Sequence, residues 1–355
     1  MNLLNRTLGE VVPVDRSFEK EIRAHLDSLT KPPGSLGYLE ELAVRYCLIT
    51  GTSRPRLGGK MLFCFAADHG VVAEGVSAYP QEVTAQMVGN MLAGGAAINV
   101  LARHSGVDVN VVDIGVTAPV GDAPGLLTRR IRAGTANIAT GPAMSVAEAE
   151  RAIEIGIELA QLAAAEGATL LGTGDMGIGN TTASSALLAA LLPSDPKSVT
   201  GRGTGIDNFG LVRKVAVVER ALEANRPLLS SPLDTLVALG GLEIAGICGL
   251  ILGAASLRVP VIVDGFISSA AALVAWRMCP PVADYLFFSH LSAEIGHRVF
   301  FSCLEARPIL DLGMRLGEGT GAALAFSVIE AAIRIYNEMA TFESAGVSKK
   351  DGVTG

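Results

Sequence analysis

The chain has 355 residues, of which 50% are hydrophobic and 18% are charged, and its formal net charge is −7 at pH 7. This length can bury a large core, and an acidic balance without a Lys/Arg-rich run argues against nucleic acid or an anionic membrane surface as a partner. The five cysteines are scattered and form no CxxC pair, which is typical of a reducing, cytoplasmic compartment and offers no thiolate metal site.

The amino terminus and two apolar segments bear on membrane targeting. The first residues contain no apolar stretch led by basic residues, so we expect no secretory signal. The apolar segments, residues 244–256 and 268–276, are shorter than the roughly 20 residues that a spanning helix needs. We therefore expect two buried helices and no membrane partner.

The first sixty residues predict helices and no strand. Residues 15–29 and 37–50 have helical patterns, and the breaker KPPG at 31–34 separates them. The last helical pattern, residues 321–339, is long and amphipathic, so it can pack against them. We predict a small helical domain formed by residues 1–58 with 325–355, and a large α/β catalytic domain formed by residues 59–324.

Short apolar runs alternate with helical patterns through the large domain. The runs that we predict as strands are residues 61–66, 109–112, 168–171, 259–263, 285–288 and 308–310. The helical patterns include residues 147–166, 181–192, 211–224 and 268–276. Apolar strands separated by helices indicate a parallel sheet covered on both faces, so the sequence predicts a doubly wound α/β fold.

Glycines and polar residues follow each predicted strand. These segments are ADHG at 67–70, DIG at 113–115, GTGDMGIGNTT at 172–182, DGF at 264–266, SHLS at 289–292 and DLGMRLGEGTG at 311–321. The carboxyl ends of parallel strands meet at one edge of a sheet, so we expect one polar crevice that includes Asp264 and Ser292. Ordinary turns favour the same residue types, which is the competing interpretation.

The loop at residues 174–182 predicts an anion site. Its glycines, Gly177 and Gly179 among them, allow close backbone approach, and Asn180, Thr181 and Thr182 are favoured at the start of a helix. Exposed amides and the dipole of the following helix together bind phosphate. A second glycine-rich segment, GRGTG at 201–205, contains Gly203 and precedes a helix that carries Lys214.

Two further patterns concern catalysis. Glu318 lies between glycines in GEGTG at 317–321, and such a carboxylate at the end of a strand is a candidate general base, although a solvated loop glutamate has the same signature. His290, Glu294 and His297 have the spacing of one helix face and could bind a metal. Their order is not HExxH and Gly296 weakens a helix there, so we predict no metal site and no cofactor.

Long segments of the chain resemble the nicotinate-nucleotide–dimethylbenzimidazole phosphoribosyltransferase family, which prepares the lower-ligand nucleotide of cobalamin. They include KPPGSLGYLEELA (31–43), FAADHGVVAEGVSAYPQEVTAQMV (65–88), GDMGIGNTTASSAL (174–187), GRGTGID (201–207), SHLSAEIGH (289–297) and LGMRLGEGTGAALA (312–325). The resemblance extends from about residue 20 to 340. It implies a Rossmann-like fold with a small helical domain, a homodimer and a site without metal.

The resemblance also implies roles for individual residues. Glu318 matches the catalytic base of the family. The region that holds the phosphoribosyl group is matched by Gly177–Thr182, Gly203, Lys214 and Ser292, and Asp175 stands where many members have glutamate. The wall of the base pocket is matched by Ser77, Tyr79, Pro80 and Met87, and we expect Met176 and Leu316 to complete it.

The implied reaction moves the 5-phosphoribosyl group of nicotinate mononucleotide to 5,6-dimethylbenzimidazole or a similar base. Its products are α-ribazole 5′-phosphate and nicotinate, and C1′ is inverted. The alternatives are a phosphoribosyltransferase with a purine or phenolic acceptor, a nucleotide-binding module without catalysis, and a metal hydrolase.

Overall fold

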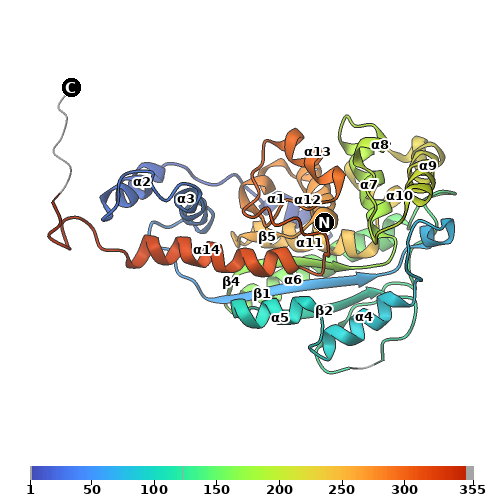
Figure 1. Cartoon of the computed structure of the whole chain (residues 1–355), viewed down its shortest axis with the longest axis horizontal. Helices are drawn as coiled ribbons and strands as arrows, with labels where there is room; N and C mark the ends of the chain where they lie inside the picture. Colours follow the sequence, from blue (N-terminus) through green and yellow to red (C-terminus); the bar gives the residue numbers. More distant parts are fainter. Residues whose placement is uncertain (1, 122, 349–355) are drawn as a thin grey trace.

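The computed structural model describes residues 2–121 and 123–348, and its centre is a parallel sheet (Figure 1). The strands are β1 (Gly59–Ala67), β2 (Asp108–Gly115), β3 (Leu126–Thr128), β4 (Ala168–Met176), β5 (Val261–Val263) and β6 (Leu286–Phe288). Their order is β3-β2-β1-β4-β5-β6, with every neighbouring pair parallel. This is the doubly wound order in which the chain changes direction between β1 and β4, where ligands bind beyond the carboxyl ends of the strands.

The predicted α/β fold is confirmed, but one predicted strand is wrong and one strand was not predicted. Residues 308–310 form only an isolated parallel bridge between Leu310 and His290. Pro308 has no N–H with which to extend a ladder. The strand that the sequence did not predict is β3, which has three residues, none of them fully buried, at the edge of the sheet.

Helices cover both faces of the sheet. One face carries α4 (Val83–Leu92), α5 (Ala97–Ser105) and α14 (Thr320–Glu338), and the other carries α6 (Val146–Ala165), α11 (Leu242–Ser256) and α12 (Phe266–Met278). The remaining helices beside the carboxyl edge are α7 (Asn180–Leu191), α8 (Pro196–Val199), α9 (Asn208–Asn225), α10 (Pro232–Leu239) and α13 (Ile295–Leu304). The predicted helices agree with these bounds to within a few residues, except that the first begins at Glu19.

The central helix pair, α6 and α11, is packed backbone to backbone. A Cβ atom on Gly249 would lie 1.9 Å from the carbonyl oxygen of Ile153, so only glycine permits this approach. Gly156 faces the carbonyl of Gly246 in the same way. Both α11 and α12 are almost wholly buried, as expected for the two apolar segments. The abundance of small residues in the sequence therefore builds a tightly packed core.

One stretch, Val83–Ser105, is long and apolar enough to cross a membrane by length and composition, and 28% of its most apolar window is buried. The chain turns at residues 93–96 and divides this stretch into α4 and α5, of 10 and 9 residues. Helices of that length rise about 15 Å, roughly half of a bilayer's hydrocarbon thickness.

The two ends of the chain meet at one end of the molecule. Figure 1 shows α2 (Glu19–Ser28) and α3 (Tyr38–Thr50) beside the carboxyl-terminal half of α14. The His25 ring nitrogen Nε2 lies 2.8 Å from the Tyr336 carbonyl, and Leu29 pairs with Thr341. The first helix, α1 (Leu3–Glu10), packs instead on α6 and α11. The domain boundaries stay a prediction, and residues 349–355 of the predicted small domain lie outside the described residues.

Candidate functional site

A cavity of about 320 Å³ lies beyond the carboxyl ends of β4, β5 and β6. The loop after β1 closes it on one side through Tyr79, and the loop before α14 closes it on another through Leu316 and Gly317. The residues predicted for the site that line this cavity are Tyr79, Asp175, Met176, Gly177, Asn180, Thr181, Gly203, Ser292 and Leu316. Loops that are far apart in the sequence therefore meet where the fold places a ligand.

Other predicted residues lie behind the wall of this cavity or at its rim. Lys214, Asp264, Thr182 and Glu318 are buried and do not line it, and neither does Gly179, the N-cap of α7. The remaining predictions, Ser77, Pro80 and Met87, belong to the segment after β1. The hydroxyl of Ser77 lies 3.1 Å from that of Thr204, which lines the cavity, whereas Pro80 is exposed and Met87 is half-buried on α4.

The start of α7 forms the most complete anion-binding geometry. Gly179 caps the helix with a φ of 97°, a conformation that glycine adopts without strain. The buried Lys214 ammonium donates a hydrogen bond to the Thr181 hydroxyl at 2.7 Å. Burial lowers the pKa of Lys214 to about 8, against the opposing effect of Glu294. A helix amino terminus, a hydroxyl and a cation thus converge on one wall.

Two residues that hold this wall were not predicted for the site. The Glu294 carboxylate accepts a hydrogen bond from the Gly203 N–H at 2.9 Å, and Arg315 donates to the Gly203 carbonyl at 2.9 Å. Together they fix the second glycine-rich loop against the segments that precede α13 and α14. A Cβ atom at Gly201 would lie 1.9 Å from the Glu294 carboxylate, so only glycine fits there. The glycines at 201 and 203 were therefore the one feature of the sequence that could have indicated a close contact at this loop.

His297 forms the support beneath Ser292. Its Nδ1 accepts a hydrogen bond from the Ser292 N–H at 2.9 Å, so the neutral ring carries its proton on Nε2, 2.9 Å from the Ser269 hydroxyl. Burial lowers the pKa of His297 to about 3, and His290 contributes to this shift, so the ring stays neutral near pH 7. Both nitrogens are therefore occupied.

His290, Glu294 and His297 do not form a metal-binding triad on one helix face. Because α13 begins at Ile295, His290 and Glu294 do not lie on one helix with His297. Within residues 2–121 and 123–348, no group of three or more His, Cys, Asp or Glu side chains could hold a metal ion.

Buried carboxylates gather behind the cavity. Asp264 accepts hydrogen bonds from the N–H groups of Gly319, at 3.1 Å, and Ala322, at 2.9 Å, so it caps α14. Asp175 accepts from the Asn180 amide at 3.0 Å through one oxygen, and its other oxygen has no partner among the described residues. Burial, and then the charge of Asp264, raise the pKa of Asp175 well above its usual value, and burial also raises the pKa of Asp264.

Glu318 occupies a strained position beside the cavity. Its φ is 62°, in the left-handed region that non-glycine residues rarely adopt, and its side chain is almost fully buried. Its Oε2 atom is buried without a hydrogen-bond partner in the described part of the chain. Burial raises the pKa of Glu318, opposed by the N–H of Ile98 and assisted by Asp264. A buried carboxylate with one unpaired oxygen and a raised pKa is suited to accept a proton.

Comparisons with known proteins agree with one another. A family model described as phosphoribosyltransferase matches residues 11–347. A nicotinate-nucleotide–dimethylbenzimidazole phosphoribosyltransferase of Chlorobaculum parvum is 60% identical over 97% of this chain and 98% of its own length, and one of Geobacter metallireducens is 55% identical over 98% and 99%.

Solved structures from Thermus thermophilus also match. The structure of CobT superposes with a TM-score of 0.90 at 53% identity, covering 94% of this chain and 99% of its own. A second structure, of a nicotinate-nucleotide–dimethylbenzimidazole phosphoribosyltransferase, has a TM-score of 0.89 at 51% identity, covering 95% of this chain and 100% of its own.

Proposed function

Since the chain belongs to the nicotinate-nucleotide–dimethylbenzimidazole phosphoribosyltransferase family, we propose that it moves the 5-phosphoribosyl group from nicotinate mononucleotide to 5,6-dimethylbenzimidazole or a similar base. The products are nicotinate and α-ribazole 5′-phosphate, the nucleotide of the cobalamin lower ligand. The observation that carries the proposal is a buried carboxylate with an unpaired oxygen, that of Glu318, next to a cavity with an anion-binding wall.

The phosphate of the donor would bind the wall formed by α7. The helix amino terminus at Asn180, the Thr181 hydroxyl and the Lys214 ammonium provide donors and positive charge. Gly203, held by Glu294 and Arg315, limits the cavity on the same side. Ser292, positioned by His297, offers a hydroxyl toward the ribose.

Glu318 would act as the general base. The pyridinium nitrogen of the donor keeps the electron pair of its bond to C1′ and leaves as neutral pyridine nitrogen, so it needs no acid. The unprotonated nitrogen of the acceptor attacks C1′ from the opposite face, and the N–H on its far side loses its proton to Glu318. A positioned base contributes about 10²–10⁴-fold to a rate, and the rest comes largely from orientation.

The acceptor would lie between the cavity and Glu318, against Tyr79, Met87, Met176 and Leu316. Because Glu318 does not line the cavity, the acceptor must displace side chains of the cavity wall to reach the Glu318 carboxylate. Tyr79 and Leu316 are 54% and 59% exposed, so they can move at little cost in packing. Asp175 would keep its unpaired oxygen for a polar group of the donor.

We further propose that the protein is a cytoplasmic homodimer. Its cysteines are all free, four of them buried, which fits a reducing compartment. Large apolar side chains are exposed at the cavity, Tyr79 and Leu316, and on α9, Phe209 and Val212. Exposed apolar surface of this kind favours association. Sedimentation analysis would test the dimer, and a monomer at micromolar concentration would contradict it.

The reaction is tested by a product assay. Chelator-treated protein is mixed with nicotinate mononucleotide and 5,6-dimethylbenzimidazole, beside the Glu318→Gln variant, and both products are followed by mass spectrometry. We expect nicotinate and α-ribazole 5′-phosphate in equal amounts from the wild type and almost none from the variant. A variant with full rate would exclude Glu318 as the base, and donor binding without transfer would exclude this acceptor.

A further inference from the structure

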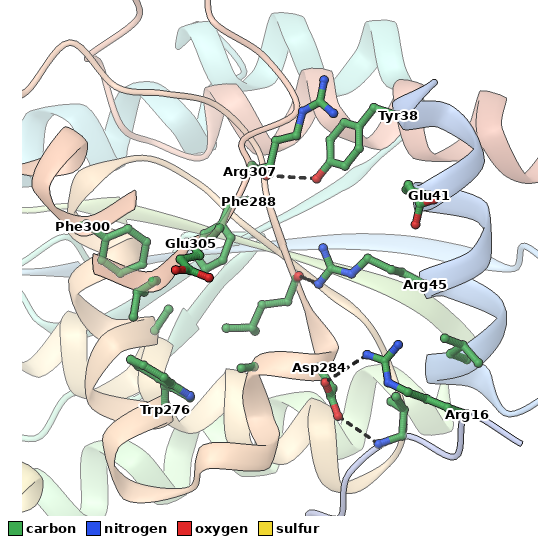
Figure 2. A pocket seen from close by; sticks show the side chains of 17 residues that line it. Arg16, Tyr38, Glu41, Arg45, Trp276, Asp284, Phe288, Phe300, Glu305 and Arg307 are labelled. Atoms are coloured by element: carbon green, nitrogen blue, oxygen red, sulfur yellow. Dashed lines mark hydrogen bonds and ion pairs between the residues drawn. The ribbon is translucent and has the colours of Figure 1, made fainter. Parts of the chain in front are cut away.

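Figure 2 shows a second and larger cavity, which has a volume of about 690 Å³. It is at the edge of the described sheet formed by β6, between the segment Val14–Leu48 on one side and α12 and α13 on the other. Its volume is typical of a small-molecule site. None of the residues that line it lines the carboxyl-end cavity.

Arg45 provides an uncommitted cation inside this cavity. Its guanidinium donates one hydrogen bond to the Leu286 carbonyl at 2.5 Å and lies 4.8 Å from the centre of the Phe287 ring. Among the described residues no carboxylate lies within 4.0 Å of it. Burial lowers the pKa of Arg45, with Tyr38 and Asp284 opposing this effect. Figure 2 shows the guanidinium pointing into the space between Tyr38 and Asp284.

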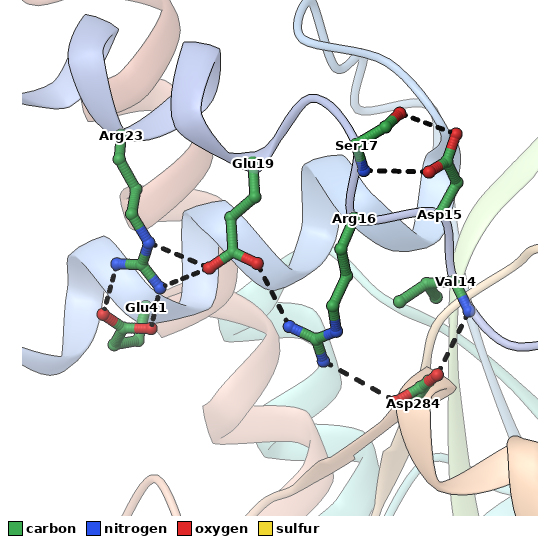
Figure 3. A network of polar contacts seen from close by, with 8 residues as sticks. All are labelled: Val14, Asp15, Arg16, Ser17, Glu19, Arg23, Glu41 and Asp284. Atoms are coloured by element: carbon green, nitrogen blue, oxygen red, sulfur yellow. Dashed lines mark hydrogen bonds and ion pairs between the residues drawn. The ribbon is translucent and has the colours of Figure 1, made fainter.

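The acidic residues on the Arg45 side of the cavity are already paired with other arginines. Figure 3 shows Arg16 bridging Glu19 and Asp284, at 3.2 and 3.8 Å. Glu41 is held by Arg23 at 2.8 Å, in a pair with both oxygens engaged. A carboxylate entering the cavity would therefore meet an arginine with free N–H groups, and planar guanidinium binds carboxylates in a two-point geometry.

The opposite wall of the cavity is aromatic. Trp276 of α12, Phe288 of β6 and Phe300 of α13 line it, as Figure 2 shows. Above them Arg307 covers the Tyr38 ring at 4.2 Å. Glu305, which adopts a left-handed φ of 51°, directs its carboxylate into the same space. Arg45 and Arg307 are in no ion pair among the described residues. Together with Glu305 and the ion pairs of Figure 3, the side chains around the cavity have as many positive as negative charges, so Arg45 acts through its free N–H groups and not through a net charge.

We propose that this cavity is a second ligand site, which binds a small aromatic monocarboxylate with the ring against Trp276, Phe288 and Phe300 and the carboxylate on Arg45. The inference does not rest on the proposed function. The planar guanidinium of Arg45 matches a carboxylate, the absence of a net positive charge disfavours a phosphate dianion, and three aromatic walls match a flat ring. In the described part of the chain, none of the large exposed apolar side chains lines the cavity, which argues against a second copy of the chain as its occupant.

The single tryptophan of the chain, Trp276, lines the cavity, so its fluorescence reports binding there and not in the carboxyl-end site. The wild type is titrated with sodium benzoate, with benzamide as the uncharged analogue of the same shape. We expect a saturable change with benzoate and none with benzamide. Arg45→Met should weaken benzoate binding by roughly 10- to 100-fold, because it removes a charge-assisted contact.

Two variants separate this effect from misfolding and from the other site. Ala306→Phe adds a ring to the cavity lining, leaves Arg45 in place and should also abolish binding. Lys214→Met alters the other cavity and should leave the benzoate titration unchanged. Equal binding by Arg45→Met and by the wild type would overturn the proposal, as would an equal response to inorganic phosphate. A tryptophan signal that ignores benzoate but changes on dilution would overturn it too, and would show that a second copy covers the cavity.

Discussion

The carboxyl-end cavity and the ion-pair network around α2 and α3 differ in whether their charged side chains have partners. Around the cavity, Asp175, Glu294 and Glu318 are buried, and each has an oxygen without a partner among the described residues. At the helical end, Arg16 and Arg23 are 61% and 44% exposed and share their carboxylate partners in a chain of ion pairs (Figure 3). The cavity holds carboxylates that lack partners, whereas this network, unlike the neighbouring Arg45, holds charge that both protein and water satisfy.

The difference indicates that the carboxylates at the carboxyl-end cavity, unlike the ion pairs of α2 and α3, are available to a ligand. A buried polar group without a hydrogen bond costs about 1–3 kcal/mol, and folding must supply that free energy from elsewhere. A ligand that brings the missing partners recovers part of this cost on binding. Exposed ion pairs offer no such gain, because their charges are already solvated. Substitutions in the two regions should therefore differ in kind: in one they change reaction and binding, and in the other they change stability slightly.

The largest expected effect is that of Glu318→Gln. Turnover should fall by about 10²–10⁴-fold, because the amide cannot accept the proton. The affinity for nicotinate mononucleotide should stay nearly constant, since the donor does not need the base. Single-turnover rates and equilibrium titration of the donor measure the two quantities separately. A parallel loss of affinity would assign Glu318 to binding instead.

Glu318→Gln should also change how the stability of the protein depends on pH. Burial raises the pKa of Glu318, so folding disfavours its ionised form, and the free energy of unfolding falls as the pH rises past the usual value of 4.5. Glu318→Gln should thus equal the wild type in stability at pH 4 and match or exceed it at pH 7. Wild-type turnover should have an acid limb with its midpoint above 4.5. Denaturant unfolding at both pH values checks the first point, and a lower stability at pH 7 contradicts it.

Lys214→Met should have the second largest effect. Loss of a charge-assisted hydrogen bond to phosphate is worth about 1.5–3 kcal/mol, so the donor should bind roughly 10- to 100-fold more weakly. The pKa of Lys214 is lowered to about 8 by burial, so wild-type affinity should decline as the pH rises past that value, while the variant stays flat. Calorimetric titration from pH 6 to about 9 measures both. An unchanged affinity at neutral pH would remove Lys214 from the phosphate site.

Asp264→Asn tests a residue that positions Glu318. The two oxygens of Asp264 accept from the N–H groups of Gly319 and Ala322, and an amide would turn its NH2 toward one of these donors. The free energy of unfolding should fall by about 1–3 kcal/mol. Turnover should fall as well, with donor affinity unchanged, because Gly319 follows Glu318. Urea unfolding and steady-state kinetics make the test, and Asp264→Glu serves as the control that keeps the charge. Full turnover in Asp264→Asn would show that the cap does not orient Glu318.

The sequence predicted the core of the fold because buried parallel strands are continuous apolar runs. It did not predict β3, which is short and not fully buried. It wrongly predicted a strand at residues 308–310, which are apolar but form a loop with one isolated bridge. The helix α1 was not predicted either, although Asn2 caps it through its side chain. Edges and short elements depend on contacts that form only after folding, so local pattern carries little information about them.

The sequence predicted those parts of the site in which the backbone needs glycine or a helix start. Glycine at 179 and 203, and the residues that begin α7, mark their loops directly. Glu294 and Arg315 gave no such signal, because their role is to hold Gly203 across more than ninety residues of sequence. Nor could the spacing of His290, Glu294 and His297 reveal that a bend before Ile295 separates them. Side chains that act through tertiary contact need the structure.

Arg23→Ala should have a small effect, which is confined to stability. Arg23 contacts Glu19 and Glu41, both at 2.8 Å, and is about half exposed. Exposed pairs contribute about 0.2–1 kcal/mol, and salt screens them, so the loss of stability should shrink further in 0.5 M salt, roughly three to five times physiological ionic strength. Turnover and donor affinity should not change.

Urea unfolding at low and high salt, with Arg334→Ala as a control on another exposed i,i+4 pair, measures this effect. A loss well above 1 kcal/mol, insensitive to salt, would mean that the network joins α2 to α3 as firmly as a core contact does. A change in turnover would have a different meaning. It would link the helical end to the carboxyl-end cavity, although none of the residues of this ion-pair network lines that cavity, and the two regions could then no longer be treated as independent.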